Sequence, residues 1–204
     1  MARQNRVTPW GEIIATPERG TCLGNRGVLH DEQGRIRRPW QVRRWLLCRL
    51  EFNGRRRVVM APNRYTELFF LDEATGLAAG HRPCFECRRA DAVAFAAAWA
   101  RAQRLNAPPQ APDMDVVLQE KRLVGREKRR HRAALDALPD GAMIVLENDA
   151  PLAVRGDALL PWSFSGYAAA RPRPRGIEVE LLTPPAIVAA LSAGYRPQWH
   201  PSAG

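Results

Sequence analysis

Two cysteines separated by two residues, Cys84 and Cys87, have the spacing that most clearly indicates chemistry in this sequence. The backbone turns tightly within a Cys-x-x-Cys motif, so both thiolates can point at one metal ion, as they do in tetrahedral zinc sites. In redox proteins the same motif follows a strand at the start of a helix in a β-α-β unit. Here it follows a predicted short helix and the dipeptide Arg82-Pro83, so the motif favours a metal site over thiol-disulfide exchange.

The residues on either side of this cysteine pair predict two helices. Asp72 can cap a short helix over residues 73–79, and Gly80 can end that helix in the left-handed conformation. A second helix is expected over residues 90–104, where apolar residues recur at helical spacing. The cysteine pair is therefore predicted to lie between two helices.

Cys48 is expected on a β-strand. It lies within the apolar segment 45–52, which is followed by Asn53-Gly54 and a second strand-like segment over residues 55–60. An Asn-Gly pair between two such segments is the strongest short signal for a β-hairpin.

The segment from Phe69 to Cys87 resembles the second half of the metal-binding domain of the Ada DNA-repair proteins. The shared pattern is a strand, a short alanine-rich helix, Ala-Gly, and then Arg-Pro-Cys-x-x-Cys. The resemblance implies a zinc ion held by four cysteines, the first two of which form a Cys-x-x-x-Cys pair at the end of a strand. In that family one of these thiolates accepts a methyl group from a DNA phosphotriester.

The resemblance makes Cys48 the counterpart of the first cysteine of that strand-end pair. Four residues later stands Phe52, which cannot bind a metal, so the methyl-transfer activity does not carry over directly. The fourth ligand is left open between Cys22 and His30. The expected zinc ligands are therefore Cys48, Cys84, Cys87 and either Cys22 or His30. For Cys48 and Cys22 the alternative is a small buried apolar residue, which is a frequent role of free cysteine.

Positive charge is concentrated in two segments of the chain. The net charge is +10, and 29 of the 31 basic residues are arginine. Residues 35–64 hold ten arginines and one acid, and residues 119–132 hold seven basic residues and two acids. Such clusters indicate phosphate binding, because the guanidinium group matches phosphate oxygens, although a solvated basic face is the alternative. The residues expected to contact nucleic acid are Arg37, Arg38, Arg43, Arg44, Arg55, Arg56, Arg57, Arg129 and Arg130. His81, next to the cysteine pair, is expected to be a surface polar residue.

The fold class is predicted as α+β, with a soft boundary in the proline-rich segment 106–112. Residues 1–105 would form the zinc-stapled β-hairpin and helix unit. Residues 113–204 would form a basic helix, from about residue 114 to 138 and interrupted at Gly125, and a small antiparallel β unit. Its strands are expected within 142–146, 152–154, 159–160 and 177–182, followed by a C-terminal helix over 185–192.

Three hypotheses for function follow from these observations. The leading one is a zinc-containing DNA-binding protein with a role in DNA repair or processing, for which DNA is a more fitting partner than RNA. The second is an enzyme in which a zinc-bound thiolate, with Cys48 as the candidate, accepts an alkyl group from damaged nucleic acid. The third is a zinc-stapled scaffold that binds an acidic protein. No apolar run reaches the roughly 20 residues of a membrane helix, and a cytoplasmic location is expected.

Overall fold

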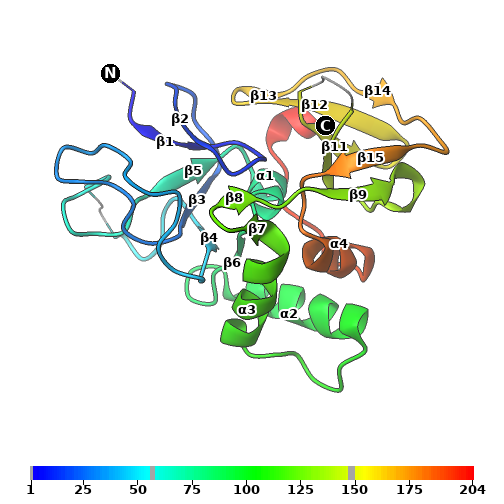
Figure 1. Ribbon diagram of the computed structural model, residues 1–204, viewed down its shortest axis with the longest axis horizontal. Coiled ribbons are helices and arrows are strands. Elements are labelled where there is room, and N and C mark those ends of the chain that lie inside the picture. Colours follow the sequence, from blue (N-terminus) through cyan, green and yellow to red (C-terminus); the bar gives the residue numbers. More distant parts are fainter. Residues whose placement is uncertain (1, 56–57, 147–149) are drawn as a thin grey trace.

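A computed structural model describes residues 2–55, 58–146 and 150–204 of the chain (Figure 1). The predicted α+β class is confirmed, because two β-sheets pack with separate helices. The helices are α1 (Glu73–Ala78), α2 (Arg89–Gln103), α3 (Ala111–Arg122) and α4 (Pro185–Ser192), with 3-10 turns at Leu135–Ala137 and Pro201–Ala203.

The first sheet has the strand order β2-β1-β5-β3-β4-β6. Two of its pairings, β1 with β5 and β4 with β6, are parallel, and the other three are antiparallel. The strands are β1 (Gln4–Val7), β2 (Ile13–Ala15), β3 (Cys22–Asn25), β4 (Leu46–Cys48), β5 (Leu68–Phe70) and β6 (Arg82–Pro83).

The second sheet is antiparallel, with the order β13-β12-β11-β10-β15-β9, and β14 also pairs with β12. Four of its strands overlap the segments 142–146, 152–154, 159–160 and 177–182 that the sequence predicts as strands, and α4 covers the residues predicted for the C-terminal helix. The strands are β9 (His131–Ala134), β10 (Met143–Val145), β11 (Leu152–Arg155), β12 (Ala158–Ser163), β13 (Gly166–Tyr167), β14 (Arg171–Pro172) and β15 (Glu178–Leu181).

Helix α1 lies between the two sheets and contacts strands of both (Figure 1). All six of its residues are buried. The predicted cap is confirmed, since the Asp72 carboxylate accepts a hydrogen bond of 2.9 Å from the Thr75 N–H. Gly80 follows the helix with φ +93°, a conformation that favours glycine.

Apolar residues from both sides of the expected boundary at 106–112 share one core. The cluster contains Val7, Leu47 and Phe70 from the first sheet, and also Ile187 and Leu191 from α4. Helices α2 and α4 pack directly against each other. The proline-rich segment therefore joins two parts of a common core.

The prediction of a basic helix to residue 138 is wrong beyond Arg122. Helix α3 ends there, and the chain forms a short hairpin of β7 (Leu123–Val124) and β8 (Glu127–Lys128) before β9. Gly125 has φ +60° in the turn of this hairpin. Strand β9 then pairs with β15, a partner about 50 residues away that local helix propensity cannot reveal.

The hairpin predicted around Asn53-Gly54 forms only in part. Both turn residues have positive φ, and the Arg55 N–H bonds to the Phe52 carbonyl. No described residue between 49 and 67 lies in a strand, however, and β4 pairs with β3 and β6. Among the described helices, none has the length and apolar character required to cross a membrane.

Candidate metal centre and adjacent basic clefts

The parallel pairing of β4 with β6 brings Cys48 close to the cysteine pair. Leu47 is in register with Pro83, so that the next residues, Cys48 and Cys84, leave the two strands side by side. The Cys84 N–H continues the pairing with a 2.9 Å hydrogen bond to the Leu47 carbonyl. Cys87 follows in the turn that leads into α2.

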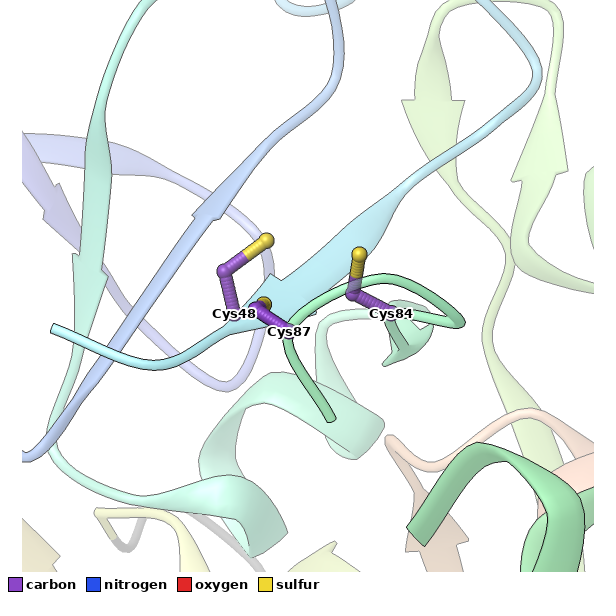
Figure 2. A group of neighbouring side chains, drawn as sticks. All are labelled: Cys48, Cys84 and Cys87. Carbon is purple, nitrogen blue, oxygen red and sulfur yellow. The ribbon is translucent and has the colours of Figure 1, made fainter. Parts of the chain in front are cut away.

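The sulfur atoms of Cys48, Cys84 and Cys87 all lie within 4.8 Å of one another and could hold a metal ion (Figure 2). All three residues are buried, and they form a small apolar cluster with Leu23. The structure therefore brings together three of the ligands expected from the sequence.

The hydrogen bonds around these sulfurs suit metal-binding thiolates. Hydrogen bonding by the Cys48 thiol, whose single proton is shared between the other two sulfurs, lowers the pKa of Cys84 to about 5 and also lowers the pKa of Cys87. Backbone N–H groups of Glu86 and Cys87 donate to the Cys84 sulfur, the first at 3.4 Å, and the Arg49 N–H donates to Cys87. A metal ion would take the place of the shared proton, since metal ligation requires deprotonated cysteine.

Cys22 lies on the opposite face of the first sheet. Its neighbour Leu23 is in register with Cys48, and successive side chains of a strand point to opposite faces. Cys22 accordingly packs in the main core with Phe70 and Leu47, where burial raises its pKa to about 12. It is not part of the cysteine group.

His30, the other candidate for the fourth ligand, is also outside the cysteine group. Its Nδ1 lies 2.6 Å from the Thr66 hydroxyl, and its Nε2 lies 3.2 Å from the Ala61 carbonyl. Both ring nitrogens thus have partners within the loop region, and the structure brings neither candidate to the three cysteines.

The three cysteines line one side of a cleft of about 430 Å³, which we call the cysteine cleft. Exposed Arg44 and Arg55, Tyr65 and the partly buried Phe85 also line it. Arg55 forms an exposed ion pair of 2.7 Å with Glu86, which lies between the two cysteines of the motif. A metal ion bound to the three thiolates would therefore adjoin a basic cleft and have a fourth coordination position that none of the identified protein ligands fills.

Two of the other predicted arginines, Arg37 and Arg38, line a second cleft of about 440 Å³ together with Trp40, Gln41 and Arg126. We call this the arginine cleft. Arg126 belongs to the second basic segment of the sequence, so the two segments that concentrate positive charge meet here.

The remaining predicted arginines are more dispersed. Arg43 is exposed, Arg129 donates to the Leu123 carbonyl, and Arg130 pairs with Glu180 of the second sheet at 3.3 Å. Arg56 and Arg57 lie outside the described residues.

His81 is fully buried, so the expectation of a surface residue is wrong. Its ring packs against Trp45 and Phe70, with centroids 5.0 and 4.7 Å apart. Burial, and then the nearby cations Arg26 and Arg122, hold its pKa well below the usual value. Arg26 is itself buried and was not expected at any site, because a single arginine in a turn-rich segment gives no signal of burial.

No family model matches the chain, and comparisons with curated proteins and with solved structures gave no match.

Proposed function

We propose that the chain is a zinc-containing protein that binds nucleic acid beside its metal centre, with DNA as the preferred partner. The observation that supports this proposal is the position of the three cysteines on the wall of a cleft that also exposes Arg44 and Arg55. The preference for DNA rests on the resemblance to the Ada metal-binding domain.

Zinc is the ion that best fits three thiolates. Soft sulfur ligands select zinc, copper(I) or iron-sulfur clusters, and zinc takes four ligands in tetrahedral sites. Cys48, Cys84 and Cys87 would hold it, and water or a ligand group would complete the coordination. Bound zinc would keep the thiolates deprotonated and would join β4 to the start of α2.

Nucleic-acid binding is supported by the exposed arginines of the two clefts. Arg44 and Arg55 lie beside the cysteines, and Arg37, Arg38 and Arg126 line the arginine cleft. Guanidinium groups bind phosphate oxygens with two parallel hydrogen bonds. Each neutralised phosphate releases counterions, so affinity should fall steeply with salt.

The test is DNA binding measured by fluorescence anisotropy over a series of salt concentrations. The double variant Arg44→Gln/Arg55→Gln should bind more weakly and should reduce the slope of log affinity against log salt by roughly 0.9 for each phosphate of duplex DNA that is no longer neutralised. Arg104→Gln removes an exposed arginine at the end of α2, outside both clefts, and serves as the matched control. Absent or salt-independent binding, or equal losses in both variants, would contradict the proposal.

A second candidate function is alkyl transfer to a zinc-bound thiolate, which the open side of the cysteine site favours. The Cys48 sulfur would attack the methyl carbon of a phosphotriester, and the carbon-oxygen bond would break with its electron pair left on the phosphate oxygen. The products are S-methylcysteine and a phosphodiester anion. Mass spectrometry after incubation with DNA that contains methyl phosphotriesters tests this function. A gain of one methyl group that disappears in Cys48→Ser supports it, and no gain contradicts it.

A further inference from the structure

A third cavity lies near the start of β4, the strand that ends at Cys48. Trp45 immediately precedes this strand, and its indole ring is stacked by two guanidinium groups. The Arg26 guanidinium carbon lies 4.5 Å from the ring centroid and that of Arg122 lies 3.9 Å from it. Because successive side chains of β4 alternate between faces, Trp45 and Cys48 point to opposite faces of the first sheet.

Three cations, Arg26, Arg122 and Lys128, line the cavity beside Trp45 together with the exposed Arg126. Arg26 is 1% exposed and Arg122 is 0% exposed, and the ammonium group of Lys128 is enclosed. The side chain of Trp40 also borders the cavity. We call this site, made of Arg26, Trp40, Arg122 and Lys128, the cation pocket.

The hydrogen-bond partners of these cations are neutral. Arg26 donates to the Gly11 carbonyl at 2.7 Å, Arg122 donates to the Gly80 carbonyl at 2.9 Å, and Lys128 donates to the Ala78 carbonyl. Within residues 2–55, 58–146 and 150–204, no carboxylate forms an ion pair with any of the three.

The charge of Asp115 acts on Arg122, but the Asp115 carboxylate already forms an ion pair with Arg82. Both of its oxygens accept hydrogen bonds from Arg82, at 2.8 and 2.7 Å. The faces of Trp45 stabilise the guanidinium groups in part, through the attraction of a cation to an aromatic ring. They supply no negative charge.

Three N–H donors of residues that line the cation pocket have no partner among the described residues. They are Nε of Arg26, Nε of Arg122 and Nε1 of Trp40. A buried donor without a partner is costly, and a buried charge without a counterion is more so. Burial lowers the pKa of Arg26 and of Arg122 to about 9, and burial and then these two arginines lower the pKa of Lys128 to about 7. An anion that accepts several hydrogen bonds would satisfy the donors and the charges together.

We propose that the cation pocket binds the phosphate group of a phosphate monoester, whose remaining part lies in the arginine cleft. Trp40 and Arg126 line both sites, so the two sites adjoin each other. A dianionic group with several acceptor oxygens matches three cations and three unpaired donors better than a carboxylate does.

The volumes of the two sites agree with a phosphate group in the cation pocket and the rest of the ligand in the arginine cleft. The cation pocket has a volume of about 40 Å³, where one water needs about 10–15 Å³, so it admits a small oxyanion but not a larger group. The arginine cleft, at about 440 Å³, has room for a nucleoside or for the end of a nucleic-acid strand. The inference does not depend on the metal centre, which faces the other side of the sheet.

Calorimetric titration of the full chain with inorganic phosphate, in buffer free of other oxyanions, tests the proposal. We expect saturable binding at one site per chain. Lys128→Met should weaken binding at least tenfold, because it removes a cation and keeps a similar side-chain length. Trp40→Phe removes the indole N–H together with its five-membered ring, keeps an aromatic side chain, and should weaken binding severalfold. Arg104→Gln, outside the pocket, should bind as the unmodified chain does.

Further arms of the titration separate the source of the phosphate and the metal hypothesis. If the ligand is the end of a nucleic-acid strand, a 5′-phosphorylated oligonucleotide should bind more tightly than its 5′-hydroxyl counterpart. A small monoester is indicated instead if a nucleoside monophosphate binds but the two oligonucleotides do not differ. Cys48→Ser should retain phosphate binding even where metal is lost. No binding of phosphate to the unmodified chain, or unchanged affinity in Trp40→Phe, would overturn the proposal, and the second result decides it if Lys128→Met does not fold.

Discussion

At the scale of single residues, the structure places cations where burial disfavours their charge. Lys128 shows this most simply, because its ammonium group shares an enclosed pocket with Arg26 and Arg122. A lysine in this setting loses its proton far more readily than one in water, since both the desolvation and the neighbouring charges disfavour the protonated form. The pH dependence of the free energy of unfolding therefore shows whether the Lys128 ammonium group is enclosed in the pocket.

We expect the free energy of unfolding of the unmodified chain, relative to Lys128→Met, to rise between pH 7 and 9. Below pH 7 the lysine is protonated in both folded and unfolded chains, so the cost of enclosing its charge is fully present. Above its folded pKa of about 7 the folded chain loses a proton that the unfolded chain keeps, and that cost is progressively relieved up to the ordinary value of 10.5. Urea unfolding of both proteins in phosphate-free buffer measures the difference. A flat or falling difference would contradict the enclosure of Lys128.

At the scale of elements, β4 connects the two candidate sites, and its residue Leu47 packs against α1. Gly76 of α1 allows this contact, because a Cβ atom there would lie 2.3 Å from Cδ2 of Leu47 in the middle of β4. Hydrogen bonds to β3 on one side and to β6 on the other hold β4 in the sheet, which limits how far it can shift. The absence of a side chain at Gly76 thus leaves room for Leu47, the neighbour of Cys48 in β4.

Gly76→Ala should therefore destabilise the chain by about 1–3 kcal/mol, the usual cost of forcing extra volume into a packed core. Displacement of β4 should also weaken metal binding. Denaturant unfolding and a competition titration with a chelator measure the two effects. Val93→Ala, at an exposed position of α2, is the control and should change neither. Unchanged stability and metal affinity in Gly76→Ala would show that α1 does not position β4.

The sequence predicted those elements whose signals are local. The Asp72 cap, the left-handed Gly80 and the Cys-x-x-Cys turn each depend on a few neighbouring residues, and the structure contains all three. The pairing of β9 with β15 and the buried positions of Arg26 and Arg122 depend on partners far along the chain. Hydrophobic periodicity carries no information about such partners, so it predicts a basic helix that continues past Arg122 and gives no signal of the cation pocket.

At the scale of the whole molecule, two carboxylates at the start of α1 connect the N-terminal and C-terminal parts. Asp72 accepts hydrogen bonds from the Tyr167 hydroxyl at 2.9 Å and from the His200 N–H at 3.1 Å. Glu73 accepts from Arg88 at 2.7 Å and from the Tyr195 hydroxyl at 2.5 Å. These bonds and the shared apolar core predict that the chain unfolds as one unit.

A chain truncated after residue 110 should accordingly fail to fold. It would leave both buried carboxylates without their tyrosine partners and would expose the core that α4 covers. Circular dichroism and thermal unfolding of the fragment check this expectation. A fragment with a cooperative transition and intact metal binding would show that residues 1–110 form an independent domain.

Arg88→Met tests the same connection with a single substitution in the full chain. It would leave the Glu73 carboxylate buried without its cation, which costs about 3–5 kcal/mol when one partner of a buried pair is removed. Tyr195→Phe removes one neutral donor from the same carboxylate and should cost about 1.5–3 kcal/mol, as for a hydrogen bond to a charged group. Denaturant unfolding measures both losses. A loss below about 1 kcal/mol in Arg88→Met would contradict the ion pair.

Metal analysis of purified variants tests directly whether Cys48, Cys84 and Cys87 hold a metal ion. We expect one zinc ion per unmodified chain by elemental analysis. Cys48→Ser, Cys84→Ser and Cys87→Ser should each lose most of the metal, while Cys22→Ser and His30→Ala should keep it. Cobalt substitution should give the absorption of a tetrahedral site with three thiolates, unchanged in Cys22→Ser. A chain without metal, or one in which Cys22→Ser loses metal as completely as Cys84→Ser does, would contradict the site.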